Sequence, residues 1–146
     1  MNHQAQIMLV EDNYMDIRLT LDAFNEAKLQ NSVNVFRNGM EALDYLFGRN
    51  KYTDITLYPL PDIILLDLNM PGIGGFEVLQ QIKNADKLKR IPVIILTSSM
   101  EAADRTLSYD IGANSYLMKP IRFEDFVEVV KKTTDYWFTL NISAPD

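Results

Sequence analysis

Three short and almost uninterrupted apolar runs constrain the fold of this chain more than any other feature. They are QIMLV (6–10), DIILLDL (62–68) and PVIILT (92–97). A strand with one solvated face alternates apolar and polar residues, whereas a strand of a parallel sheet that is covered on both faces reads as a continuous Val/Ile/Leu run. The three runs therefore predict buried parallel strands with helices on both faces of the sheet.

Two weaker strands and five helical stretches complete the pattern. Strands alternating with helices predict a parallel sheet with right-handed crossovers, that is, a three-layer α/β fold of five βα units. The weaker strands are SVNVF (32–36) and NSYLM (114–118). Helical spacing is clear at Ile17, Leu21 and Phe24 and at Phe123, Phe126, Val127 and Val130, and weaker over 40–47, 76–83 and 101–110.

Length, charge and residue usage exclude several classes of protein. A chain of 146 residues suits one domain, 1–146, with a single core. The net charge of −6, with basic residues gathered only in short pairs such as Lys89-Arg90, argues against a nucleic acid partner. There is no cysteine, and the one histidine, His3, stands near the N-terminus, so neither a thiolate metal site nor a histidine-based site is expected. Without a signal peptide or a membrane-spanning run, the expected location is the cytoplasm, with no membrane partner.

Polar side chains interrupt the apolar runs at one edge of the predicted sheet. Glu11 and Asp12 follow the first strand, Asp67 ends the third, Thr97 ends the fourth, and Lys119 follows the fifth. In an open α/β sheet, ligands bind beyond the carboxyl ends of the strands, where the strand order reverses. With the flavodoxin-like order 2-1-3-4-5, strands one and three are neighbours, so the three carboxylates are expected to converge on one crevice.

Three acidic side chains in one crevice repel each other unless a cation lies between them. Mg²⁺, or Mn²⁺ in its place, is the natural ion because hard cations take carboxylate and carbonyl oxygens and bridge to phosphate. The amide of Asn69, the hydroxyl of Thr97 and the ammonium of Lys119 would surround the oxygens of Asp67. A carboxylate nucleophile, a metal and nearby donors are the groups that accept a phosphoryl group.

Each of these residues also has a plainer interpretation. Asp67 could cap a turn before NMPG, and Glu11 or Asp12 could cap the first helix. Thr97 could be an ordinary strand residue, Asn69 an ordinary turn residue and Lys119 a solvated surface lysine. The combination at a single sheet edge favours the phosphoryl site over these separate explanations.

The motifs LVEDN, ILLDLNMPG, ILTSS and YLMKPI, in this order and at strand ends, resemble the receiver domain of two-component response regulators. The resemblance covers residues 6 to about 135 and leaves an aromatic extension, 135–146. It implies that Asp67 is the phosphoacceptor and that Asp12 binds Mg²⁺ directly. It further implies that Glu11 binds the ion through water and that the backbone carbonyl of Asn69 is a ligand.

The same resemblance implies a set of switch residues. Thr97 would move its hydroxyl to the phosphoryl group, and the aromatic rotamer at position 116 would follow it. Asn69 would help to tune the rate of hydrolysis. The remaining roles are Lys119 as the ion pair of Asp67, Tyr116 as the switch aromatic, Pro120 after a cis bond, Ser98 beside the phosphoryl group, and Ser99 as a second residue that tunes hydrolysis.

Within the receiver family, the chain is most similar to single-domain regulators that partner bacterial phytochromes. The features are the long segment 48–61 and the ending DYWFTL (135–140). The resemblance implies a histidine kinase as partner, of the phytochrome class, and a homodimer through the face of the fourth helix, fifth strand and fifth helix and through the C-terminal aromatics. Gly74 stands where many receivers carry aspartate, which is expected to loosen that loop. For 48–61 we favour a surface loop over a partner contact.

Three rival functions compete with a phosphorylation-controlled switch that is not an enzyme. A phosphohydrolase with an aspartyl phosphate usually has a second aspartate two residues after the first, where this chain has Asn69. A flavodoxin-like electron carrier would need a Ser/Thr-Gly phosphate loop after the first strand, where this chain has VEDNYMD. A receiver fold used as an unphosphorylated scaffold is disfavoured by the intact site. The sequence therefore favours the switch.

Overall fold

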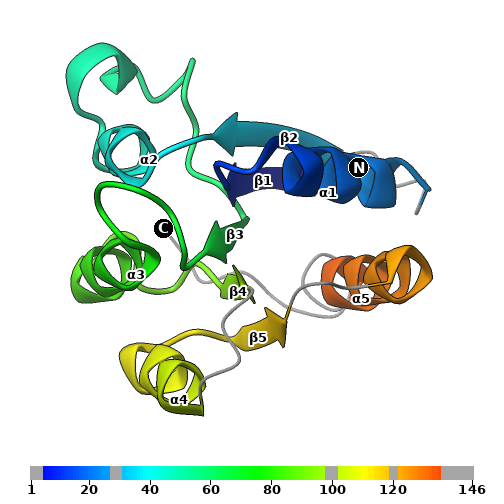
Figure 1. Ribbon diagram of the computed structural model, residues 1–146. Helices are drawn as coiled ribbons and strands as arrows, with labels where there is room; N and C mark the ends of the chain where they lie inside the picture. The colour runs from blue at the N-terminus through cyan, green and yellow to red at the C-terminus, as the bar shows by residue number, and fades with distance from the viewer. Residues whose placement is uncertain (1–4, 27–30, 98–101, 119–121, 136–146) are drawn as a thin grey trace.

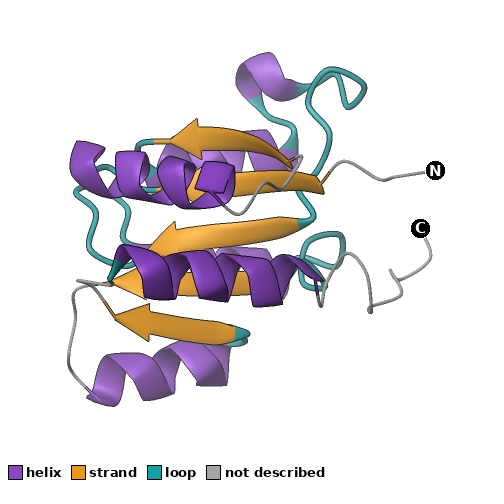
Figure 2. Ribbon diagram, turned by 90° about the vertical axis from the view of Figure 1, so that its right-hand side faces the viewer, coloured by secondary structure: helices purple, strands orange, loops and turns teal. Residues whose placement is uncertain are grey.

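The computed structural model describes residues 5–26, 31–97, 102–118 and 122–135. Five parallel strands form one sheet in the order β2-β1-β3-β4-β5, and the arrowheads visible in Figure 2 point the same way. The predicted α/β class and strand order are therefore confirmed. The strands are β1 (Ala5–Val10), β2 (Asn31–Phe36), β3 (Ile63–Asp67), β4 (Val93–Thr97) and β5 (Ser115–Met118).

Helices cover both faces of the sheet, which makes the three layers (Figure 1). One face carries α1 and α5, and the other carries α2, α3 and α4. The elements match the predicted helical stretches, and the last helix runs five residues beyond Val130. The helices are α1 (Tyr14–Glu26), α2 (Gly39–Phe47), α3 (Gly75–Asn84), α4 (Ala102–Ile111) and α5 (Phe123–Asp135).

The two central strands explain the uninterrupted apolar runs. Every residue of β3 and of β4 is buried. Ile64 and Leu66 pack into the core under α2 and α3, while Ile63 and Leu65 pack into the core under α1 and α5. Because alternate side chains enter different cores, neither face of these strands needs polar residues.

Segment 48–61 departs from a plain surface loop. It contains one turn of 3₁₀ helix, Asn50–Tyr52, and Tyr52 is only 7% exposed. The rings of Tyr52 and Tyr58 pack edge-on at a centroid distance of 5.0 Å, and Tyr52 packs against Tyr45 at 5.1 Å. The prediction is correct for the exposed residues around Ile55, but it is wrong for Tyr52, which belongs to the core beside α2.

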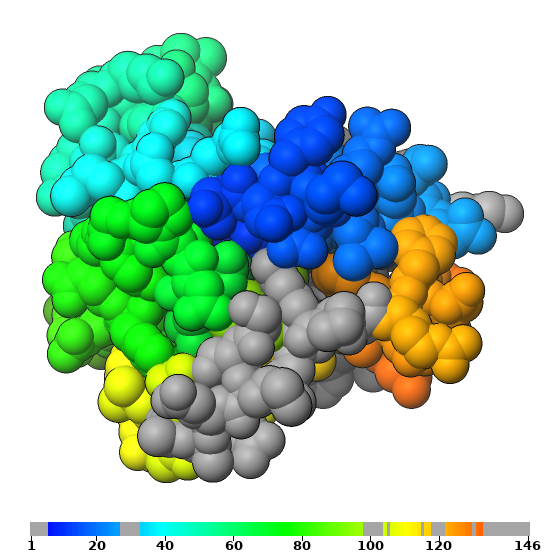
Figure 3. Space-filling model, in the orientation of Figure 1, coloured from blue at the N-terminus to red at the C-terminus, as the bar shows by residue number. Residues whose placement is uncertain are grey.

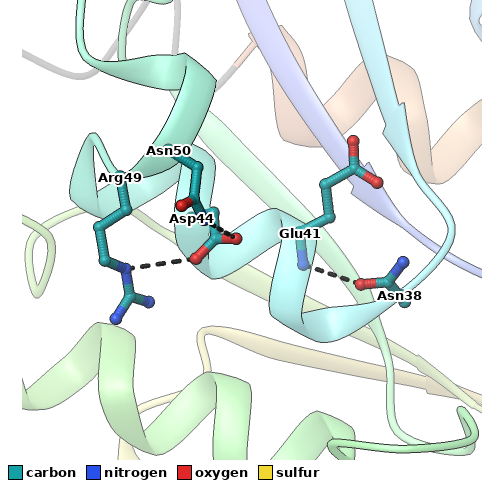
Figure 4. Close-up of polar contacts among 5 residues, drawn as sticks. All are labelled: Asn38, Glu41, Asp44, Arg49 and Asn50. Carbon is teal, nitrogen blue, oxygen red and sulfur yellow. Dashed lines mark hydrogen bonds and ion pairs between the residues drawn. The ribbon is translucent and has the colours of Figure 1, made fainter.

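The end of α2 fixes how this segment begins (Figure 4). Gly48 takes the left-handed conformation, φ 66°, that ends a helix without steric cost for glycine. The carboxylate of Asp44 then accepts a hydrogen bond from Asn50 Nδ2 at 2.8 Å and pairs with Arg49 Nε at 3.3 Å. One carboxylate on the last turns of α2 therefore holds the first residues of segment 48–61 against that helix.

Because of Tyr52, we expect the free energy of unfolding to fall when the pH rises above 10. Burial, together with the 2.7 Å hydrogen bond that its hydroxyl donates to Glu41, raises the pKa of Tyr52 to about 12, from 10.0. The neutral phenol is favoured by folding, so its contribution is complete below pH 10 and is lost as the pH rises toward 12. Tyr52→Phe should cost about 1 kcal/mol at neutral pH, and the difference from wild type should shrink above pH 10. Urea unfolding across this pH range measures both, and a difference that does not change with pH would contradict the assignment.

Candidate functional site

The carboxyl ends of β1 and β3 lie side by side. The strands pair in parallel register with Val10 opposite Leu66, so the residues that follow them, Glu11 and Asp67, are placed next to each other. In Figure 3 the blue segment after β1 and the green segment after β3 meet on the same face of the molecule. The predicted convergence of strands one and three at this edge is therefore confirmed.

Three carboxylates gather at this edge. One oxygen each from Glu11, Asp12 and Asp67 lies within 4.8 Å of the other two. Glu11 is 1% exposed and Asp67 4% exposed, and Asp12 is half-buried. All three were predicted from the sequence, and the structure brings them together.

The connection from β1 to α1 holds two of these carboxylates and is only three residues long. Asn13 caps α1, because its Oδ1 accepts a hydrogen bond from Asp16 N at 3.0 Å. Glu11 Oε2 in turn accepts from Asn13 N at 3.3 Å. The alternative in which Glu11 or Asp12 caps the first helix is therefore wrong. The signal was present in the sequence, since an Asn directly before a helical stretch with an acidic residue in its first turn marks a helix start.

Asp67 and Asn69 tie the end of β3 to the end of β4. Asp67 Oδ1 accepts from Asn69 N at 3.1 Å, so the plainer interpretation of Asp67 as a turn-capping residue also holds. The side-chain Nδ2 of Asn69 donates to Thr97 Oγ1 at 2.7 Å, and Thr97 is fully buried. Two of the polar residues that were predicted beside Asp67 are thus linked to each other at the site.

The start of α3 lies close against the backbone of Asp67. Gly75 N donates to Leu68 O at 3.3 Å, and a β-carbon at position 75 would stand 2.5 Å from Asp67 O and 2.6 Å from Leu68 Cα. Only glycine fits this approach. Gly74 takes the cap position of α3 without a side-chain hydrogen bond, which is the local consequence of lacking aspartate there.

The remaining predicted site residues divide between described and undescribed parts of the chain. Tyr116 lies on β5 opposite Ile95 of β4 and is half-buried against the core under α2 and α3. Ser98, Ser99, Lys119 and Pro120 lie outside the described residues, as do the C-terminal aromatics Tyr136, Trp137 and Phe138.

Arg37 belongs to the site edge although no role was predicted for it. It follows β2, and its Nη2 donates to the backbone carbonyl of Asp12 at 3.0 Å. The rule that selected Glu11 and Asp67, polar residues at the carboxyl end of a strand, also selects Arg37. It was not predicted, because the groups expected at a phosphoryl site were carboxylates, a hydroxyl, an amide and a lysine.

The donor set fits a hard divalent cation. All three side-chain donors are carboxylate oxygens, which Mg²⁺ and Mn²⁺ prefer, and their spacing allows one ion to contact them directly or through water. Two of the carboxylates are buried side by side, an arrangement that a cation between them stabilises.

Comparison with known proteins gives the family. The family model of the response regulator receiver domain matches residues 7–131. The chain belongs to this family. Receivers accept a phosphoryl group in two-component signalling, with a histidine kinase as partner and a divalent metal at the acidic site, and this chain is a response regulator of that kind. No helix in the described part of the chain is long and apolar enough to cross a membrane.

Individual receivers resemble the chain over almost its whole length. The probable methanogenesis regulatory protein FilR2 of Methanothrix harundinacea is 39% identical and aligns with 94% of this chain and 86% of its own. Response regulator Rcp1 of Synechocystis is 36% identical, covering 93% of this chain and 90% of its own. The Mn²⁺-bound crystal structure of Rcp1 matches with a TM-score of 0.82 and 34% identity, over 97% of this chain and 99% of that one.

A third relative is the phosphorylated cyanobacterial phytochrome response regulator RcpA. Its crystal structure matches this receiver with a TM-score of 0.85 and 38% identity, over 96% of this chain and 98% of that one. The match to RcpA confirms the predicted resemblance to regulators of the phytochrome type.

Proposed function

We propose that Asp67 is the phosphoacceptor of this response regulator. The observation that carries the proposal is the position of its buried carboxylate within 4.8 Å of two others at the end of β3. A carboxylate oxygen of Asp67 forms a bond to phosphorus while the bond from phosphorus to the donor's leaving group breaks. The product is an aspartyl phosphate, and no oxidation or reduction is involved.

The metal ligands in this proposal are Asp12, Asp67 and the backbone carbonyl of Asn69, with Glu11 binding through water. A bound Mg²⁺ or Mn²⁺ would neutralise negative charge on the phosphoryl oxygens. The chain's own task is to hold the carboxylates at this spacing before the metal arrives. The buried ends of β1 and β3 do this through their paired register.

The proposed switch begins at Thr97. Its hydroxyl bonds to the amide of Asn69, and on phosphorylation it would turn to a phosphoryl oxygen instead. A change from 1:99 to 99:1 between inactive and active forms needs about 5.5 kcal/mol of differential stabilisation. In the proposal Tyr116 follows Thr97 as the switch aromatic. Asn69 keeps its proposed role in tuning the rate of hydrolysis. The roles of the undescribed residues stay predictions: Ser98 beside the phosphoryl group, Ser99 as a second residue that tunes hydrolysis, Lys119 as the ion pair of Asp67, and Pro120 after a cis bond.

The finer assignments rest on likeness to Rcp1 and RcpA. We propose a phytochrome-type histidine kinase as donor, although the likeness to FilR2, a regulator named for methanogenesis, extends over the same length. We also propose a homodimer through the face of α4, β5 and α5 with the C-terminal aromatics, one receiver domain over 1–146, and a cytoplasmic location. The chain would act as a switch and not as an enzyme that turns over external substrate.

Phosphoryl uptake by the wild-type protein tests the proposal. With Mg²⁺ and acetyl phosphate, intact-mass spectrometry should show a gain of one phosphoryl group, and hydroxylamine should remove it because acyl phosphates are labile to this nucleophile. Chelation of the metal with EDTA should prevent the gain. Absence of any gain with metal present would contradict the proposal. Repeated hydrolysis of added phosphoesters would instead favour the phosphohydrolase.

A further inference from the structure

We propose that Arg37 is a positioning residue for the metal site. Its guanidinium holds the backbone of Asp12 and thereby aims the carboxylates of the β1–α1 connection at the metal. This inference rests on the proposed function, which makes Asp12 and Glu11 metal ligands.

The sheet itself brings Arg37 to this place. Parallel pairing sets Val10 opposite Phe36, and Glu11 N extends the pairing by donating to Phe36 O at 2.9 Å. One residue beyond Glu11 and one residue beyond Phe36, Arg37 Nη2 donates to Asp12 O at 3.0 Å. The contact therefore continues the β1–β2 pairing past the end of the strands, with a side chain in place of a backbone amide.

Arg37 is mounted on two fixed elements. Phe36, before it, is buried as the last residue of β2. Asn38, after it, caps α2 by accepting from Glu41 N at 2.8 Å, as Figure 4 shows. The backbone of Arg37 is therefore held between a strand end and a helix start, so binding the carbonyl orders only the rotamers of its own side chain, and the contact can set the position of the connection.

Two effects of the guanidinium on metal binding have opposite signs. Its positive charge repels a divalent cation, which would weaken binding, whereas its hydrogen bond fixes the ligand geometry, which strengthens binding. Arg37 is exposed, so solvent and salt screen the charge. Ligand placement within about 0.5 Å decides affinity at metal sites, so positioning outweighs repulsion. The sign of the change on removing Arg37 tells the two effects apart.

The experiment measures the dissociation constant for Mg²⁺ by calorimetry on the full chain. Arg37→Ala should bind Mg²⁺ roughly tenfold more weakly than wild type. Loss of a residue that orients a metal ligand costs about 10- to 100-fold in affinity, and we expect the smaller value because Arg37 is exposed. Arg37→Lys, which keeps a donor and the charge, should recover part of the loss. This loss of Mg²⁺ affinity should persist in high salt, because salt screens the charge of the guanidinium but leaves its hydrogen bond in place. Hydrogen exchange at the Asn13 amide, which bonds to Glu11, should be faster in metal-free Arg37→Ala.

Arg49→Ala is the matched control, because Arg49 is also exposed and pairs with Asp44 near the other end of α2. It should bind Mg²⁺ as wild type does. Unchanged or tighter binding by Arg37→Ala, with binding lost in Asp12→Asn, would overturn this inference and leave the proposed function intact. If Asp12→Asn itself binds Mg²⁺ like wild type, the proposed metal site falls, and this inference falls with it.

Discussion

Asp67→Asn is expected to abolish phosphoryl uptake from acetyl phosphate, lowering the rate by at least about 10³-fold, as removal of a nucleophile does in enzymes. An amide nitrogen or oxygen does not replace the carboxylate as nucleophile, and one metal ligand loses its charge. The fold should survive because the amide oxygen can still accept the hydrogen bond that Asn69 N donates to Asp67 Oδ1. Intact-mass spectrometry with Mg²⁺ and acetyl phosphate measures the uptake.

Asp62→Asn is the matched control for this experiment. Asp62 precedes β3, and its Oδ2 accepts from Gln6 N at 2.8 Å, at the opposite end of the same strands. It should take up a phosphoryl group as wild type does. Continued uptake by Asp67→Asn, with a melting midpoint like that of wild type, would mean that another residue is the acceptor.

Gly75→Ala is expected to destabilise the fold by about 2 kcal/mol and to slow phosphorylation. Its β-carbon would lie 2.5 Å from Asp67 O and 2.6 Å from Leu68 Cα, and backbone atoms at the end of a buried strand give way only if β3 or α3 moves. The melting midpoint should fall by roughly 5 °C. Because a displacement near 1 Å at a reacting group costs up to about 10²-fold, phosphoryl uptake should slow by roughly tenfold or more.

The neighbouring glycine supplies the control. A β-carbon at position 74 would meet no atom of the described residues within 4 Å, apart from its chain neighbours, and the φ of −78° is one that any residue adopts. Gly74→Ser should therefore change stability by no more than a few tenths of a kcal/mol, and its hydroxyl can cap α3. If Gly74→Ser and Gly75→Ala lowered the free energy of unfolding equally, the close approach of position 75 to the backbone of Asp67 would not be the reason for glycine there.

The fold was predictable because its strongest constraints are local in the sequence. The runs around Ile64 and Ile95 are continuous because both faces of their strands are buried, and a parallel sheet between two helical layers is the arrangement that buries such runs. The site edge followed from the same pattern, since Glu11 stands where the first run, 6–10, stops and Asp67 stands near the end of the run 62–68. Strand order then placed them together.

What could not be predicted depends on tertiary contacts of single side chains. Tyr52 stands among polar residues and turn formers, and only its packing against Tyr45 and Tyr58 places it in the core. The contact from Arg37 to Asp12 depends on the register of β1 against β2, and on the rotamer of a long side chain. Gly75 resembles any other turn glycine in the sequence, because a close approach to backbone leaves no trace in the neighbouring residue types.

Segment 48–61 and the carboxylate cluster lie at opposite edges of the sheet, where β3 begins and where it ends (Figure 2). Exposed side chains such as Ile55 and Leu57 can therefore mutate without touching Asp67. Sequence changes in the segment that precedes β3 are therefore expected to leave the chemistry at the carboxyl end of β3 unchanged.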